Sequence, residues 1–204
     1  IKGNGSYWRP NKGWYSMINI LNADNVTVEG VILRDAAVAN ISINYSENIN
    51  VSDVKIIAEP EPFFVNTDGI IFWSSKDITV NNILYKGTDD FTSHGGDKNS
   101  LIQDNENINV KNSVVYTDGT GCAFKIGTTA QQDFIRKINY ENIDIVTTST
   151  MASFWPVTGA NFEDITFNTI RVEDILDFSR TEENIDSFSL FNFRIIEVSW
   201  EPTS

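Results

Sequence analysis

An apolar alternation that recurs six times is the feature of this sequence that most limits its fold. The repeats begin 23 to 30 residues apart, and apolar residues occupy every second position within them, as they do in β-strands. The repeats start at Asn25, Asn48, Asp77, Asn107, Lys137 and Asp164. Self-similarity at a period of this length is typical of solenoids, in which each repeat buries its apolar face against its neighbours.

Alignment of the repeats produces four apolar columns. The first two are Val26, Ile49, Ile78, Ile108, Ile138, Ile165 and Val28, Val51, Val80, Val110, Tyr140, Phe167. The third and fourth are Val31, Val54, Ile83, Ser113, Ile143, Ile170 and Leu33, Ile56, Tyr85, Val115, Ile145, Val172. The step between the second and third columns is occupied by Gly30, Asp53, Asn82, Asn112 and Asn142. Because these residue types tolerate turn and left-handed conformations, we predict a corner between two strands and a stacked polar ladder along it.

An earlier strand precedes most of the repeats, at 16–21, 39–45, 68–73, 122–127 and 152–157. Three strands and three turns per repeat describe one coil of a parallel β-helix, whose strands stack about 4.8 Å apart. A propeller blade is longer, and a leucine-rich repeat has its own leucine spacing. We expect 181–200 to form a seventh, irregular coil whose aromatic residues cover the end or pack on further coils. The sequence thus predicts an all-β fold, a right-handed parallel β-helix of about seven coils.

Length, charge and cysteine usage limit the remaining possibilities. A chain of 204 residues is expected to form a single β-helix domain over 1–204, trimmed at both ends. Its formal net charge of −13 disfavours nucleic acid and anionic membranes as partners. No apolar stretch reaches the roughly 18 to 20 residues of a membrane span. Cys122 is the only cysteine, which excludes an intrachain disulfide and a four-thiolate zinc site. We expect a monomer.

Three aspartates, Asp68, Asp89 and Asp90, are the candidate chemical centre. Aspartate is common in turns, where it caps the backbone or is solvated, so one such residue carries little meaning. Asp89, however, follows Asp68 by 21 residues, which is close to one coil. Stacked coils would bring the three carboxylates to one side of the solenoid. Their mutual repulsion would raise at least one pKa and keep an acid protonated near neutrality.

The motifs around these aspartates resemble the polygalacturonase family of glycoside hydrolases. Segments 25–36 and 41–56, then NTDG and GTDD, follow the order of that family's consecutive coils. The resemblance implies a secreted β-helical enzyme that hydrolyses cell-wall polysaccharide by inversion, and we expect no cofactor and no metal. It also implies that Asp89 is the general acid, while Asp68 and Asp90 hold and deprotonate the attacking water, with acid and base roughly 6.5 to 9.5 Å apart. Asn66, in the first motif, is expected to contact substrate.

Two positions depart from the family's pattern. Gly121, Cys122 and Ala123 stand where the family has Gly-His-Gly, so cysteine replaces the histidine. The family's Arg-Ile-Lys, which binds the substrate carboxylate, corresponds to 152–159, where arginine and lysine are missing. Without a guanidinium clamp, plain galacturonan is an unsuitable substrate, whereas the ring of Trp155 suits a neutral sugar. A related β-helical family that acts on dextran resembles this arrangement as well.

Further side chains are candidate substrate contacts. His94, the only histidine, lies in a glycine-rich segment that we expect to be an exposed loop. There it either contacts substrate or tunes the aspartates in place of the missing histidine, or it is a plain loop residue. Lys125 either binds a carboxylate or sugar hydroxyl beside the aspartates or is a solvated strand lysine. Trp73 either stacks on sugar or packs in the core. Cys122 is expected to be a small buried residue rather than a nucleophile.

Two other functions remain open from the sequence. Acidic β-helices include calcium-dependent lyases, and three aspartates suit a cation, but a lyase also needs a uronate and a well-placed basic residue. A non-catalytic module, such as a carbohydrate-binding stalk or an adhesin, explains the repeat equally well. It gives no reason for the two aspartate motifs to share one side. We therefore predict an inverting glycoside hydrolase that acts on a polysaccharide.

Overall fold

The structure, a computed structural model, describes residues 1–11, 15–58, 66–97, 104–117, 121–130, 134–155, 160–175 and 189–193. The elements are α1 (Gly5–Trp8), β1 (Ile18–Leu21), β2 (Asp24–Glu29), β3 (Ile32–Arg34), β4 (Ile41–Asn44), β5 (Glu47–Ile57), β6 (Ile70–Trp73), β7 (Lys76–Gly87), β8 (Thr92–Gly96), β9 (Asn105–Thr117), β10 (Cys122–Ala130), β11 (Phe134–Thr148), β12 (Thr150–Phe154), β13 (Asn161–Ile175) and β14 (Ser189–Phe193). Among these residues, no helix has the length and apolar character that a membrane crossing requires.

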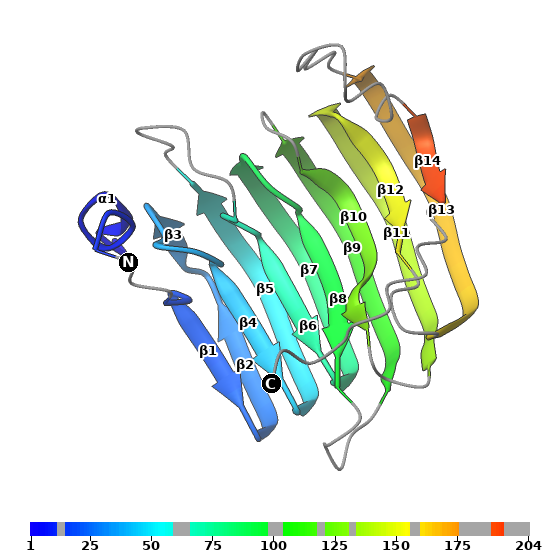
Figure 1. The fold of residues 1–204 in the computed structure, drawn as a ribbon, viewed down its shortest axis with the longest axis horizontal. Coiled ribbons are helices and arrows are strands. Elements are labelled where there is room, and N and C mark those ends of the chain that lie inside the picture. Colours follow the sequence, from blue (N-terminus) through cyan, green and yellow to red (C-terminus); the bar gives the residue numbers. More distant parts are fainter. Residues whose placement is uncertain are drawn as a thin grey trace, which may run out of the picture.

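Parallel pairing arranges the strands into two sheets. The first sheet has the order β1-β4-β6-β8-β10-β12-β14, and the second has the order β13-β11-β9-β7-β5-β2, with β3 also paired to β5. The chain alternates between the sheets, so neighbouring strands in either sheet are one repeat apart (Figure 1). The predicted parallel β-solenoid is therefore confirmed.

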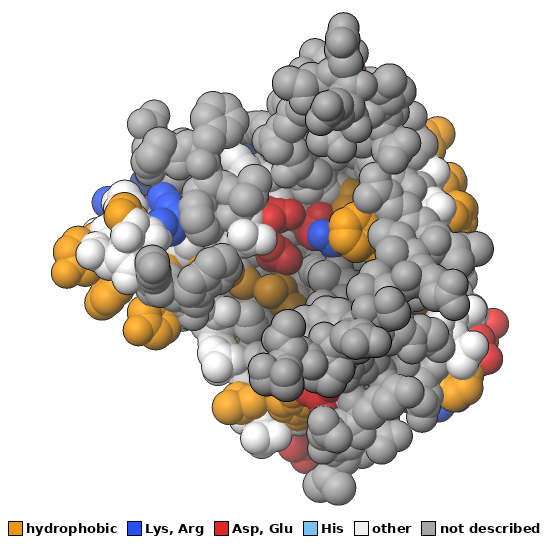
Figure 2. All heavy atoms as spheres, in the orientation of Figure 1, with side chains coloured by type: hydrophobic (Ala, Val, Ile, Leu, Met, Phe, Trp, Pro, Cys, Tyr) orange, Lys and Arg blue, Asp and Glu red, His pale blue; other side chains and the backbone are white. Residues whose placement is uncertain are grey.

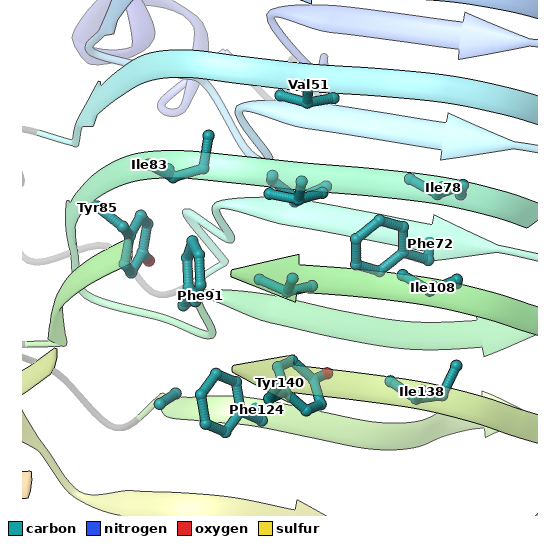
Figure 3. Close-up of a cluster of buried hydrophobic side chains, with 14 of the residues drawn as sticks. Val51, Phe72, Ile78, Ile83, Tyr85, Phe91, Ile108, Phe124, Ile138 and Tyr140 are labelled. Atoms are coloured by element: carbon teal, nitrogen blue, oxygen red, sulfur yellow. The ribbon is translucent and has the colours of Figure 1, made fainter. Parts of the chain in front are cut away.

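The apolar columns pair as the sequence predicted. In the first column, Ile78 pairs with Ile49 on one side and with Ile108 on the other. In the fourth column, Tyr85 pairs with Val115. Figure 3 shows first-column isoleucines lying above one another along the interior. The columns of the four middle repeats are buried in one core, against which most column residues of the first and sixth repeats pack half-buried. The coils are thus in register along the length of the second sheet.

The predicted corner residues adopt the left-handed conformation. Gly30 has a φ of 66°, and the φ angles of Asp53, Asn82, Asn112 and Asn142 lie between 53° and 57°. The Asn82 side-chain amide donates to Asp53 Oδ1, and the Asn142 amide donates to Asn112 Oδ1 at 2.8 Å. From β5 onward the strand continues through this corner. The two strands predicted on either side of it therefore form one continuous strand in these coils.

The prediction of an exposed loop around His94 is wrong. The residue lies in β8, where it pairs with Phe72 on one side and with Ile126 on the other. Its imidazole is fully buried, and Nε2 lies 2.8 Å from the hydroxyl of Tyr140, which also lies 3.1 Å from Thr92 Oγ1. Because these interior residues are polar, the segment lacks the apolar alternation that predicts a strand. His94 supports the core and does not face a substrate on the outer surface.

The seventh coil is less complete than predicted. It contributes only β14, and the rest of 181–200 lies outside the described residues. Phe193 stacks on Phe154 with 4.6 Å between ring centroids, and Phe191 contacts Phe167 edge-on at 5.6 Å. The aromatics of β14 therefore cover part of the preceding coil, while 70% of Phe193 stays exposed.

Candidate active site

The three aspartates lie before adjacent strands of the first sheet. Asp68 precedes β6, and Asp89 and Asp90 precede β8. The N–H of Gly69 donates to the backbone oxygen of Asp90 at 2.8 Å, so the segment that carries Asp68 lies directly beside the segment that carries the pair. The structure thus brings together the three residues that the sequence places one coil apart.

Two glycines allow this close stacking. A Cβ added at Gly69 would lie 2.5 Å from the backbone oxygen of Phe91, and one added at Gly121 would lie 2.6 Å from that of Asp89. Both distances are far below ordinary van der Waals contact, which begins at 3.4 Å. A side chain at either position would push the coils apart, so these glycines set the spacing of the cluster.

Asp90 has the most complete set of partners. Its Oδ1 accepts the backbone N–H of Cys122 at 2.8 Å and the thiol of the same residue at 3.0 Å. Its Oδ2 lies 3.2 Å from Nζ of Lys125, and only 3% of the Asp90 side chain is exposed. Two donors and a cation favour the charged form of a carboxyl group. The negative charge of the cluster is therefore best stabilised on Asp90.

Asp89 lies in a different environment. Its Oδ2 accepts the N–H of Asn66, and its Oδ1 accepts the N–H of Asp90 at 2.9 Å. Burial, followed by repulsion from Asp90, raises the pKa of Asp89 to about 6, although Lys125 and the two hydrogen bonds act in the opposite direction. A carboxyl group with this pKa keeps a population of the protonated form near neutrality, as a general acid requires.

The pKa of Asp68 is raised as well, as that of Asp89 is. Burial raises the pKa of Asp68 well above its usual value, the charges of Asp90 and Asp89 add to the effect, and Lys125 opposes it. Because the three carboxyl groups interact, they take up protons as a unit and not independently. The cluster therefore holds protons at a pH where isolated aspartates are ionised.

A tyrosine beneath the cluster was not identified from the sequence as part of the site. The hydroxyl of Tyr85 donates to the backbone oxygens of Asp89 and Thr67, at 2.8 and 3.2 Å. Thr67 Oγ1 in turn lies 2.9 Å from Thr88 Oγ1. These bonds hold both aspartate-bearing segments against the core. The one signal in the sequence is that a tyrosine takes a place that aliphatic residues occupy in the other coils.

Lys125 faces the aspartates and pairs with a carboxylate, the first of the two alternatives that its sequence context left open. Its ammonium contacts Asp90 and lies 4.6 Å from the centre of the Trp155 ring. Burial is the largest single influence on the pKa of Lys125 and would lower it, but the charges of Asp90, Cys122 and Asp89 and the hydrogen bond to Asp90 together raise it. Figure 2 shows acidic side chains gathered in a central hollow, with a basic and a hydrophobic side chain beside them.

The other expected substrate contacts have different surroundings. Trp73 is partly exposed at the end of β6, and its indole nitrogen lies 3.1 Å from the hydroxyl of Tyr45 and 3.3 Å from Asp97 Oδ2. Trp73, five residues along the chain from Asp68, thus belongs to an aromatic and acidic cluster with Tyr45 and Asp97. Asn66 meets the aspartates through its backbone N–H, which binds Asp89.

Cys122 acts as a donor within the site. It is buried, and burial followed by the charge of Asp90 raises its pKa well above that of an ordinary thiol. The residue therefore remains a neutral thiol and not a thiolate nucleophile. Within the described residues, no group of three or more His, Cys, Asp or Glu side chains is arranged to hold a metal ion.

Comparison with known proteins identifies similar sequences. A family model described as "Glycosyl hydrolases family 28" matches residues 1–176. A curated relative from Aspergillus niger, named "Putative galacturan 1,4-alpha-galacturonidase A", is 26% identical over 164 residues. The match covers 71% of this chain and 35% of that relative, so the chain spans about a third of the relative's length.

Proposed function

Because this chain belongs to family 28 of the glycosyl hydrolases, we propose that it cleaves a polysaccharide by inversion through Asp68, Asp89 and Asp90. The observation that carries the proposal is the cluster itself, in which three carboxyl groups from adjacent coils meet. Of these three groups, only Asp90 takes part in an ion pair among the described residues. Repulsion between such groups destabilises a fold. A site that retains this repulsion is a candidate for chemistry that needs it.

The three groups divide the reaction between them. Protonated Asp89 gives its proton to the glycosidic oxygen while the bond from that oxygen to the anomeric carbon breaks. Charged Asp90 takes a proton from water, whose oxygen attacks the anomeric carbon from the opposite face, and Asp68 holds that water. The water oxygen ends on the sugar with inverted configuration, and the Asp89 proton ends on the leaving hydroxyl.

We propose a neutral sugar unit at the cluster, although the name of the relative refers to galacturan. The positive charge of Lys125 is already opposed by Asp90 at 3.2 Å. The negative charge and acidic surroundings of the hollow would repel a uronate carboxylate, whereas the ring of Trp155 beside Lys125 offers an apolar face to a sugar ring. Trp73 offers a second such face. Action outside the cell on cell-wall polysaccharide is part of this proposal.

The general acid is tested by Asp89→Asn. The substrate panel contains galacturonan, dextran, pullulan, α-1,3-glucan and sulfated algal glycans. On the best substrate we expect reducing-end release to fall by about 100-fold or more, with thermal unfolding nearly unchanged. Asp144→Asn is the control, because Asp144 is an exposed aspartate paired with Arg171 on the second sheet. Full activity of Asp89→Asn would remove this residue from the acid role.

The same panel separates the alternative functions. Binding of a glycan by the parent protein without any release of reducing ends would indicate a non-catalytic carbohydrate-binding module. Activity that a chelator abolishes, with an unsaturated product detected by its ultraviolet absorbance, would indicate a lyase. Preference for galacturonan would overturn the neutral sugar while leaving the hydrolytic mechanism in place.

A further inference from the structure

We propose that Lys125 is a positioning residue that keeps the negative charge of the cluster on Asp90 and so determines which aspartate acts as the base. This inference rests on the proposed hydrolytic function. Its starting point is the contact of 3.2 Å between Lys125 Nζ and Asp90 Oδ2, with side chains that are 20% and 3% exposed. Among the described residues, the ion pairs include neither Asp68 nor Asp89.

The groups around Asp90 explain why one cation determines which aspartate carries the negative charge. Those that titrate or carry charge are Asp68 before β6, Asp89 before β8, Cys122 and Lys125 in β10, and Tyr85 in β7. The two acids disfavour a charge on Asp90. Cys122 supplies two hydrogen bonds, and Tyr85 bonds to backbone oxygens below. Within the described part of the chain, Lys125 supplies the positive charge that offsets the acids.

The lysine side chain is itself held in place. In β10 it pairs with Ser93 of β8 on one side and with Ser153 of β12 on the other. Both neighbours have short side chains, which leave room for the lysine to cross to Asp90. The ammonium also lies over the ring of Trp155, 4.6 Å from its centre. These contacts orient the charge toward a protein carboxylate.

Loss of this charge should therefore change the protonation of the cluster more than the affinity for sugar. Without the ammonium, the proton that belongs on Asp89 would be shared with Asp90, and fewer molecules would hold an acid and a base at the same time. A residue whose main role is to bind substrate would instead change KM. The pH profile and the split between kcat and KM distinguish these roles.

Three substitutions at this position test the inference. Lys125→Met removes the charge and keeps the length of the side chain, Lys125→Arg keeps the charge, and Lys125→Gln is a second neutral variant if methionine prevents folding. The matched control is Lys76→Met, because Lys76 pairs with Glu47 at 2.7 Å on the second sheet and is 40% exposed.

On the best substrate of the panel, the acidic limb of the kcat/KM profile of Lys125→Met should move upward by about 1 to 3 pH units. At pH 5 we expect kcat to fall about tenfold or more, with KM within about twofold of the parent. Lys125→Arg should restore the limb, and Lys76→Met should leave it in place. An unmoved limb overturns the inference, as does a raised KM with unchanged kcat.

A second measurement does not depend on activity. In a carbon-13 NMR titration of aspartate carboxyl groups, with Asp89 assigned through Asp89→Asn, the Asp89 signal of Lys125→Met should titrate at a higher pH than in the parent, because the Lys125 charge that lowers the pKa of Asp89 is gone. Lys76→Met should not change it. If this change occurs in a protein that cleaves no glycan, the proposed function fails and the electrostatic role of Lys125 stands. If the change is absent, the inference fails in an active enzyme as well.

Discussion

Replacement of Gly121 by alanine is predicted to displace Asp89. A Cβ at this position would lie 2.6 Å from the backbone oxygen of Asp89 and closer still to its Cα and carbonyl carbon, whereas ordinary contact begins at 3.4 Å. The segment that carries Asp89 must therefore move by about 1 Å, a displacement that costs about 100-fold in rate at a catalytic group. The overpacking should also cost about 1 to 3 kcal/mol, which lowers the melting temperature by roughly 2 to 12 °C.

Measurements of kcat and of thermal unfolding check this prediction, with Gly30→Ala as the control. Nothing lies within 4 Å of a Cβ added at Gly30, but its φ of 66° is strained for alanine, at a cost of about 1 to 2 kcal/mol. The control should lose stability and keep kcat, because this corner belongs to the second sheet. Parental kcat in Gly121→Ala would refute the argument, and an equal loss of kcat in both variants would attribute the effect to destabilisation.

Two further predictions concern stability. Burial lowers the pKa of His94 to about 3, below its unfolded value near 6.5, so stability falls as pH drops from about 6.5 towards 3. Between pH 7 and pH 5 the parent should lose about 2 kcal/mol more than His94→Phe in urea unfolding, and equal losses would contradict this. The His94→Phe variant is needed as a reference because Asp89 has the opposite effect. Its raised pKa makes the fold more stable as pH falls through about 6. Asn112→Ala, at φ 53°, should cost about 1 to 2 kcal/mol and Asn112→Gly less, by the same assay.

The register of the second sheet could be predicted because its interior side chains are almost all apolar. One strand of the first sheet could not, because Thr92 and His94 of β8 are polar and share a hydroxyl partner in Tyr140, 46 residues beyond the histidine. The alternation of apolar and polar residues in one segment cannot reveal a hydrogen-bond partner that lies so far along the chain. The sequence pattern therefore predicts a loop where an interior strand lies.

Backbone conformation was only partly predictable from residue type. The corner positions carry Gly, Asp and Asn, which indicated left-handed backbone, and their φ angles confirm it. The residues that open the repeats are left-handed as well, with φ between 50° and 59°, although their residue types did not predict this conformation. One of these is Lys137, a residue type that rarely adopts this conformation. The stacking of coils, and not residue preference alone, sets the backbone there.

The aspartate cluster could be predicted from the length of a coil, but the side to which Lys125 points could not. Cys122, Ala123 and Phe124 are all buried at the start of β10, so the strand does not alternate cleanly until Lys125. The reason is that Cys122 lies under the carboxylate of Asp90 and not in the apolar core. A residue buried by the active site and one buried by the core look the same in a sequence.

The preference of the negative charge for Asp90 over Asp68 follows from the order of the coils. Neighbouring strands lie about 4.8 Å apart, a separation at which two charged carboxylates repel by roughly 3 kcal/mol near a protein surface. Lys125 lies on the coil after Asp90, while the coil before Asp68 offers Asn40, whose neutral amide binds the backbone oxygen of Asp68 at 3.0 Å. The ammonium is therefore beside Asp90 and one coil further from Asp68. A cation placed before Asp68 would reverse this preference, so the position of the lysine in the stack, and not the chemistry of the aspartates, assigns the charge.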